Sequence, residues 1–268
     1  MNPAALIDDQ RYPLTAPQSK AYADAVAFAQ AGLRAQGAAE LEGFLSGAGL
    51  NACLADAEAL SAQAFWSEGQ GSAYLETPGE AWPATHPRAQ RMFYRVGVVA
   101  YDQFPSASPL RQLYEWPPLL TFVRTVLATD QLFRYADPLG ALNLAVMGEG
   151  DALQWHYDQT DFVVSLALRA AVQGGHFEVA PRLRSAEDER YDAVATVLAG
   201  ESAQVQVLPL HAATLLLFAG RHSLHRVSPI AGQPPRLVAL LGYDNAPATF
   251  STPQLQMKRY GREMRRAT

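Results

Sequence analysis

The apolar positions along the chain change from a helical period to a strand period near residue 93. Before that point, apolar residues recur every three to four positions, as on one side of an amphipathic helix. Helices are therefore expected over 17–35 and 48–65, with a short strand at 41–45 between them. Residues 67–90 are rich in Gly, Pro, Ser and Thr, and they predict a loop that is either a surface connection or a cover over a pocket.

After residue 93, strands predominate. Residues 94–101 have strand composition, whereas 109–128 predict two short helices divided at Pro117 and Pro118, and 187–199 predict one more helix. The remaining strands are expected at 131–135, 141–147, 153–157, 161–169, 175–180, 203–208, 213–218, 222–228 and 235–243. Many short strands after a helical start predict a mainly β fold with flanking helices, whose core is a double-stranded β-helix, the jelly-roll or cupin-like arrangement.

No repeat, low-complexity tract or linker divides the sequence, so residues 1–268 are expected to form a single domain. Within it, residues 1–90 form a helical N-terminal part and a loop, 93–245 form the jelly-roll core, and 246–268 form a C-terminal tail. The basic residues of that tail are expected to be solvated.

Composition and charge narrow the classes of function. The chain is 49% apolar and 18% charged, which is typical of a globular protein, and its net charge of −5 comes without a basic stripe, so nucleic acid is not an expected partner. It has no 18-residue apolar segment and no basic, apolar leader, so we expect no membrane partner and a cytoplasmic location. The single cysteine, Cys53, excludes an internal disulfide and is expected to be buried. The sequence leaves open whether the protein forms a homodimer.

The segment 153–158 carries the first candidate chemistry, because it ends in His156-Tyr157-Asp158. Alternate side chains of a strand share a face, so His156 and Asp158 can point into one cavity. Two imidazoles and one carboxylate on one side of an ion leave the opposite positions open, which is the arrangement of non-haem Fe(II) oxygenases. A second histidine is therefore needed from elsewhere in the chain.

His225 is the preferred second histidine. It lies three positions after His222, and in an extended strand the two face opposite ways, so only one can point at the metal. A turn at 231–235 would form a hairpin that returns Arg236 to the side of the strand holding His225. An arginine there could pair in bidentate fashion with one end of a dicarboxylate.

Four stretches of the sequence carry a resemblance to a known family. They are Ala136-Asp137-Pro138-Leu139-Gly140, Trp155-His156-Tyr157-Asp158, Gly174-Gly175-His176-Phe177-Glu178, and Gly220-Arg221-His222-Ser223-Leu224-His225-Arg226-Val227. Together with Arg236, they resemble the Fe(II)/2-oxoglutarate-dependent oxygenases, and in particular the small-molecule branch that includes amino-acid hydroxylases and free-amino-acid radical halogenases. The resemblance covers about residues 93–245.

The resemblance implies cofactors and roles. Fe(II) would be held by His156, Asp158 and His225, the 5-carboxylate of 2-oxoglutarate would be bound by Arg236, and O2 would be the other co-substrate. Halogenases of this branch have glycine where this chain has Asp158, so the resemblance implies a hydroxylase and not a halogenase. No catalytic residue is expected beyond the metal ligands.

The substrate is expected to be a small molecule with an unactivated C–H bond, such as a free amino acid or a similar metabolite. Asn143 is a candidate contact for 2-oxoglutarate, with satisfaction of backbone groups as its alternative role. Candidate substrate residues are Asp137, Gln159, His176 and Glu178, and His176 could instead be an exposed strand residue. The alternatives are desaturation or epoxidation by the same cofactors in natural-product biosynthesis, or a cupin-like metal-dependent isomerase that does not activate oxygen.

Overall fold

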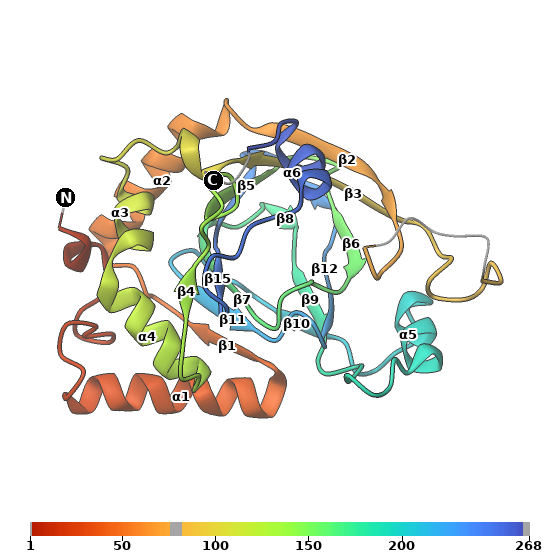
Figure 1. Ribbon diagram of the computed structural model, residues 1–268, viewed down its shortest axis with the longest axis horizontal. Coiled ribbons are helices and arrows are strands. Elements are labelled where there is room, and N and C mark those ends of the chain that lie inside the picture. Colours follow the sequence, from red (N-terminus) through yellow and green to blue (C-terminus); the bar gives the residue numbers. More distant parts are fainter. Residues whose placement is uncertain (1, 76–81, 265–268) are drawn as a thin grey trace.

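A long antiparallel sheet curls on itself and forms the body of the protein (Figure 1). The structure is a computed structural model, which describes residues 2–75 and 82–264. The strands follow one another in the order β1, β11, β7, β14, β5, β3, β6, β12, β9, β10, and β2 pairs with β3. Their bounds are β1 (Ala38–Leu41), β2 (Phe65–Gly71), β3 (Met92–Val99), β5 (Leu142–Met147), β6 (Leu153–His156), β7 (Val163–Arg169), β9 (Phe177–Ala180), β10 (Gln206–Leu208), β11 (Leu215–Phe218), β12 (Leu224–Val227) and β14 (Arg236–Leu241).

Strand β3 joins the two halves of this sheet. Its residues 97–99 pair with β5, whereas Tyr94 pairs with Leu153 of β6. The strands β1, β11, β7, β14 and β5 therefore form one wall, and β6, β12, β9 and β10 form the facing wall. Two short pairs lie apart from them, β8 (Gln173–Gly174) with β13 (Ile230–Ala231) and β4 (Phe133–Arg134) with β15 (Tyr243–Asp244). The predicted double-stranded β-helix is confirmed.

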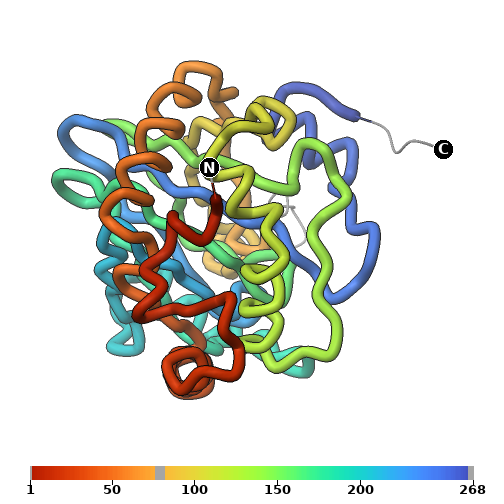
Figure 2. The backbone as a smooth tube through the Cα atoms, turned by 90° about the vertical axis from the view of Figure 1, so that its left-hand side faces the viewer, coloured from red at the N-terminus to blue at the C-terminus, as the bar shows by residue number. Residues whose placement is uncertain are grey.

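Four helices cover the outer face of the first wall (Figure 2). They are α1 (Lys20–Gln36), α2 (Gly47–Ser61), α3 (Pro109–Glu115) and α4 (Pro117–Leu127). Helix α1 begins after Ser19, whose side chain caps it. Helix α4 begins at Pro117 and Pro118, which lack the backbone N–H that would have no partner in the first turn of a helix. Short 3-10 helices occur at η1 (Pro3–Leu6) and η2 (Tyr101–Gln103), and α5 (Tyr191–Leu198) packs outside the second wall. No described helix is long and apolar enough to span a membrane.

The alternation of side chains along each strand creates two apolar layers. On β5, Leu144 and Val146 pack against the helices, while Ala145 and Met147 point between the two walls. The same alternation on β14 sends Leu237 to the helices, which leaves the preceding residue on the inner face. Cys53 is buried in the helical layer, as predicted, and burial raises the pKa of its thiol to about 12.

Most predicted strands and helices are confirmed, but three segments of the first ninety residues are placed differently. The strand expected at 41–45 is instead Ala38–Leu41, because Gly43 adopts a left-handed backbone (φ +61°) that ends it. The predicted helix 48–65 stops at Ser61. The prediction of a loop is wrong over residues 67–71, because these residues belong to β2. In the described chain β2 pairs with β3 alone, so it is an edge strand and has few apolar residues.

The prediction of a C-terminal tail from residue 246 is also wrong, because residues 253–260 form α6 (Pro253–Tyr260) against β2 and β3. Gln256 and Tyr260, one turn apart, are buried. The Gln256 amide donates to Asp137 Oδ1 (2.9 Å), and the Tyr260 hydroxyl donates to Asn143 Oδ1 (2.9 Å). Asp137 also accepts from the backbone nitrogens of Leu139 (2.9 Å) and Ser251 (3.1 Å).

We expect the Asp137→Ala variant to lose about 3 kcal/mol of unfolding free energy, because the change leaves buried donors of Gln256 and Ser251 without an acceptor. Urea denaturation followed by circular dichroism measures this loss. The control is Asp130→Ala at an exposed carboxylate, for which a change below about 0.5 kcal/mol is expected. Equal stability of the two variants would contradict this role of Asp137.

Candidate metal centre

Strand pairing places two imidazoles side by side between the walls. Strands β6 and β12 pair with His156 opposite His225, and their ring centroids lie 4.3 Å apart. Asp158 follows the end of β6, where its backbone nitrogen donates to the Gly220 carbonyl (3.1 Å). Its carboxylate then lies 3.2 Å from His225 Nε2 and 4.0 Å from His156 Nε2. One donor atom from each of the three residues lies within 4.8 Å of the other two.

Backbone carbonyls fix which nitrogen of each imidazole faces the carboxylate. His156 Nδ1 lies 2.7 Å from the Gln154 carbonyl, and His225 Nδ1 lies 2.9 Å from the Ser223 carbonyl, two residues earlier in both cases. A carbonyl can only accept, so Nδ1 carries the proton and the lone pair of Nε2 points at the shared centre. These carbonyls orient the imidazoles in the way that outer groups orient metal ligands.

Burial and the neighbouring charges set the protonation of the cluster. Burial, together with His225, lowers the pKa of His156 to about 4. Burial alone would raise the pKa of Asp158, but His225 and His156 lower it to about 2. Burial lowers the pKa of His225, but the Asp158 carboxylate outweighs it, so this pKa is raised. The carboxylate is therefore ionised and His156 is neutral, the forms in which both bind metal ions.

The close approach of Asp158 Oδ2 to His225 Nε2 is suited to binding a cation. Asp158 Oδ2 is buried and accepts no hydrogen bond in the described part of the chain. When Nδ1 holds the imidazole proton, two lone pairs meet there at 3.2 Å, and only an added proton or a metal ion between them removes the repulsion. Two imidazole nitrogens and one carboxylate are a donor set suited to Fe(II).

Gly220 makes room for this carboxylate. A Cβ at Gly220 would overlap Asp158 Oδ2 and would lie 3.0 Å from the Cβ and Cγ of Asp158. The glycine is required by this close approach, since its backbone conformation is open to other residues. Sequence reasoning placed Gly220 in a stretch that resembles the family but did not identify this contact, because nothing local reveals an approach of residues so far apart in the sequence.

Arg236 projects into the interior from β14 of the first wall, whereas the two histidines lie on strands of the facing wall. The predicted hairpin that would set it beside the strand of His225 is wrong, because β12 pairs with β6 and β9, whereas β14 pairs with β5 and β7. The residue is only 6% exposed, and burial lowers the pKa of its guanidinium to about 10. In the described chain its hydrogen bond is to Met147 Sδ (4.0 Å). A buried guanidinium without a carboxylate partner is suited to an anionic ligand.

A cavity of about 350 Å³ leads to this cluster. His156, Asp158 and Gln159 lie on its lining, to which β2, β3, β5, β6, β14 and α6 contribute. Ser72 and Leu75 also line it, so the described part of the predicted loop does border the pocket, and residues 76–81 of that prediction lie outside the described residues. The missed residues are those of α6, including Lys258 and Arg259, because the sequence was interpreted there as a tail.

The remaining candidate residues serve other contacts. Asn143 uses its amide nitrogen for the carbonyls of Leu139 and Leu142 (2.8 Å each), in line with its alternative role, and Asp137 holds α6. Glu178 pairs with Arg226 (2.8 Å), and His176 is exposed. Of the four substrate candidates, the structure places Gln159 alone on the described lining of the cavity.

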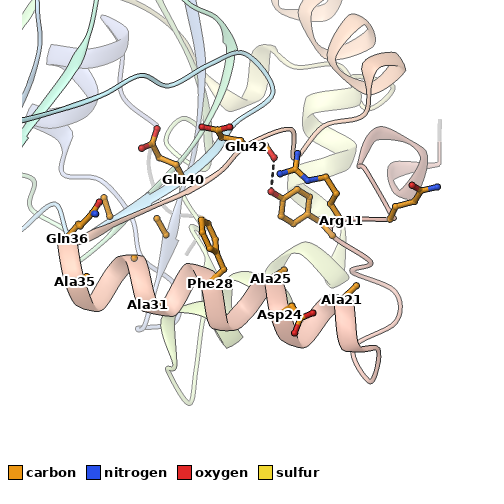
Figure 3. A pocket seen from close by; sticks show the side chains of 15 residues that line it. Arg11, Ala21, Asp24, Ala25, Phe28, Ala31, Ala35, Gln36, Glu40 and Glu42 are labelled. Atoms are coloured by element: carbon orange, nitrogen blue, oxygen red, sulfur yellow. Dashed lines mark hydrogen bonds between the residues drawn. The ribbon is translucent and has the colours of Figure 1, made fainter.

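A larger groove of about 860 Å³ runs between α1 and β1 (Figure 3). It is lined by the exposed ring of Phe28 and by the carboxylates of Asp24, Glu40 and Glu42. Its described lining contains no histidine, and it lies outside the space between the two walls. The groove is therefore separate from the candidate metal centre.

The fold and the cluster together place the protein in one class, the proteins with the fold of the Fe(II)- and 2-oxoglutarate-dependent oxygenases. An oxidoreductase of the 2OG-Fe(II) oxygenase family from Burkholderia pseudomallei superimposes with a TM-score of 0.54, at 16% identity over 82% of this chain and 91% of that one. AviO1 from Streptomyces viridochromogenes Tue57 gives 0.57, at 17% identity over 85% and 96%. The epimerase SnoN, in complex with Fe3+, alpha ketoglutarate and nogalamycin RO, gives 0.56, at 18% identity over 84% and 85%.

Within this class, residues 85–254 match the model of the family described as Halogenase D. This is more than half of the chain, so the protein belongs to that family, and the predicted resemblance is confirmed. No curated protein matches the sequence. The predicted cofactors Fe(II), 2-oxoglutarate and O2 are those of the fold class, and the cluster of His156, Asp158 and His225 agrees with them.

We expect Gly220→Ala to weaken Fe(II) binding about 10- to 100-fold, because the added methyl group displaces the Asp158 carboxylate. Anaerobic equilibrium dialysis measures the affinity. Gly47→Ala is the matched control, since a Cβ at Gly47 meets nothing within 4 Å. Wild-type affinity in Gly220→Ala would show that the carboxylate does not bind the metal in this position.

Proposed function

We propose that the protein is an Fe(II)- and 2-oxoglutarate-dependent dioxygenase that hydroxylates an unactivated C–H bond of a small molecule. The observation that carries this proposal is the pairing of two incomplete sites in one interior. One is the set of lone pairs of His156, Asp158 and His225, which needs a cation, and the other is the buried guanidinium of Arg236, which needs an anion. A metal-chelating dicarboxylate satisfies both.

In this proposal His156, Asp158 and His225 hold Fe(II), and Arg236 binds the far carboxylate of 2-oxoglutarate. With O2 and 2-oxoglutarate, the iron supplies the oxidising power to replace C–H by C–OH, and 2-oxoglutarate leaves as succinate and carbon dioxide. The protein's own residues orient the partners. Asp158 stays ionised as a ligand and does not act as a base, since its pKa is held at about 2. The rings of Phe177 and Phe218 pack around His225 and keep water away.

Hydroxylation is favoured over halogenation by Asp158. By the resemblance described above, halogenases of this branch have glycine at that position, which opens a metal position for chloride. Here a carboxylate is present, with its Oδ2 3.2 Å from His225 Nε2 and its Oδ1 4.0 Å from His156 Nε2. This chain therefore belongs to the family described as Halogenase D but carries a donor set suited to the transfer of oxygen to carbon. Desaturation and epoxidation use the same ligands and remain the alternatives. A cupin-like isomerase is less well supported, because it would leave Arg236 without an anion.

The substrate is proposed to be a free amino acid or an amino-acid-like metabolite. The cavity of about 350 Å³ is at the small end of the range for ligand sites, which favours a compact molecule over a macromolecular one. Its lining combines apolar side chains with a few polar groups, including Gln159 and Gln254. We further propose that the protein acts in the cytoplasm on such a metabolite without a nucleic-acid or membrane partner; whether it acts as a homodimer is left to measurement.

The test of this function is an anaerobic titration of the metal-free protein with Fe(II) and then with 2-oxoglutarate. We expect the weak visible charge-transfer band of a chelated 2-oxo acid on iron, and we expect it to shift when an amino acid that binds is added. Iron binding without any band would favour the cupin-like isomerase.

We expect Asp158→Ala to abolish product formation, because two imidazoles alone do not complete the donor set. Succinate release and hydroxylated product are measured by mass spectrometry, with and without chloride. The wild-type protein is expected to give the same hydroxylated product in both media. A chlorinated wild-type product would contradict the proposed hydroxylation, and normal turnover by Asp158→Ala would contradict its role as ligand.

We expect Arg236→Ala to raise the apparent KM for 2-oxoglutarate at least about 30-fold, because it removes a buried charge partner of the dicarboxylate. The iron affinity of this variant should stay within about 2-fold of the wild type. Arg124→Ala, which removes an exposed arginine on α4, is the control for loss of one positive charge. An unchanged KM in Arg236→Ala would show that the anion is bound elsewhere.

A further inference from the structure

Helix α6 presents two different sides to the rest of the molecule. Gln256 and Tyr260 are buried and bind Asp137 and Asn143, which fixes the rotation of the helix. Positions three and four apart share a helix face. Leu255, Lys258 and Arg259 accordingly lie together on the cavity lining, with Thr252 and Gln254 at the start of the helix. Figure 1 shows α6 above the rim of the curled sheet, beside β2 and β3.

Positive charge dominates the described lining of the cavity. Its charged residues are Asp158, Lys258 and Arg259, and Asp158 belongs to the metal cluster. Lys258 Nζ lies 4.6 Å from the centre of the Tyr94 ring, so that ammonium is already in contact with an aromatic face. In the ranges 2–75 and 82–264, Arg259 has no carboxylate within ion-pair distance, whereas its neighbour Arg262 forms a two-fold pair with Asp102 (2.6 and 2.7 Å).

Arg259 shares a cavity with the metal cluster. His156 and Asp158 of the cluster lie on the same described lining as Arg259. The guanidinium is half-buried at the cavity edge. The same lining includes the apolar side chains of Val96, Val98 and Leu240. The cavity therefore combines metal-cluster residues, an arginine and apolar wall.

We propose that Arg259 binds the carboxylate of the substrate, which is a small carboxylate with an apolar body whose C–H bond lies toward the metal cluster. This inference rests on the proposed function and names the chemistry that its substrate must have. A guanidinium presents paired N–H donors that match a carboxylate. The described lining offers no acid besides Asp158 to receive an ammonium, so a substrate with a second, cationic group at its far end is disfavoured.

In this arrangement Asp137 and Asn143 contribute to substrate binding indirectly. Both act as positioning residues, because they hold Gln256 and Tyr260 and so set the direction in which α6 presents Arg259. Neither contacts the described cavity lining. Their effect on substrate affinity should therefore run through Arg259.

The experiment measures binding by calorimetry to full-length protein loaded with Zn(II) and 2-oxoglutarate, which does not turn over. The probes are matched sets that share one skeleton, such as 4-methylpentanoate, L-leucine and L-leucinamide, extended to the corresponding valine, methionine and phenylalanine compounds. The variants are Arg259→Ala, Arg259→Lys and the remote control Arg124→Ala. Affinity for 2-oxoglutarate itself is measured in each variant.

We expect the wild type to bind at least one free carboxylate, and to bind its amide about 10-fold or more weakly. Arg259→Ala should weaken carboxylate binding about 10- to 100-fold and abolish the preference over the amide. Arg259→Lys should recover part of it, and Arg124→Ala should match the wild type. Asp137→Asn, which keeps the size of the side chain, should give a smaller loss that disappears in the Arg259→Ala background.

Four results would overturn the assignment, and three of them concern the substrate. They are equal binding of acid and amide by the wild type, a preference retained in Arg259→Ala, and binding of none of the carboxylates. A loss in Arg259→Ala that affects 2-oxoglutarate alone would assign the arginine to the co-substrate and also overturn it. The proposed function fails separately, because its test is the chelate band on iron, which does not depend on which substrate is present.

Discussion

The approach of Asp158 Oδ2 to His225 Nε2 is the constraint on which the interior depends. Two backbone carbonyls commit the imidazole protons to the far nitrogens, so the near nitrogens and the carboxylate oxygen face one another as acceptors. Strand pairing holds His156 and His225 in register, and a glycine without a side chain lets Asp158 approach. The surrounding β-structure keeps these acceptors together, and a cation makes the arrangement favourable.

The residues of the cluster could be predicted from the sequence because strand periodicity is a local signal. It shows which nearby side chains share a face of a strand and which do not. His156 and Asp158 share a face by alternation, and the same rule allows only one of His222 and His225 to face the metal. The choice of His225 depended on a hairpin to Arg236 that the structure does not contain. The route of Arg236 could not be predicted, since which strands become neighbours depends on sheet order and not on the turn that joins them. The burial of Arg236 at the start of β14 is a finding of the structure.

The substrate side of the pocket was missed for a different reason. A short helix with Lys258 and Arg259, followed by Arg262, has the composition of a solvated tail, and its two buried residues, Gln256 and Tyr260, are polar. They become buried only because Asp137 and Asn143 offer hydrogen-bond partners more than one hundred residues earlier. The sequence suggested Asp137 as a substrate contact, and Asn143 either as a contact for 2-oxoglutarate or as a partner of backbone groups. In the structure both residues form hydrogen bonds within the protein itself.

Helix α6 lies outside the sheet, and no ladder hydrogen bond joins it to the strands that carry the histidines. The wall that selects a ligand and the frame that holds the reactive centre are therefore separable parts of the chain. Replacement of residues 252–264 by the equivalent segment of a relative, with Asp137 and Asn143 retained as its docking points, would exchange selectivity while leaving the reactive centre unchanged. This gives protein engineers, and natural recombination, a short cassette for altering which molecules the fold accepts.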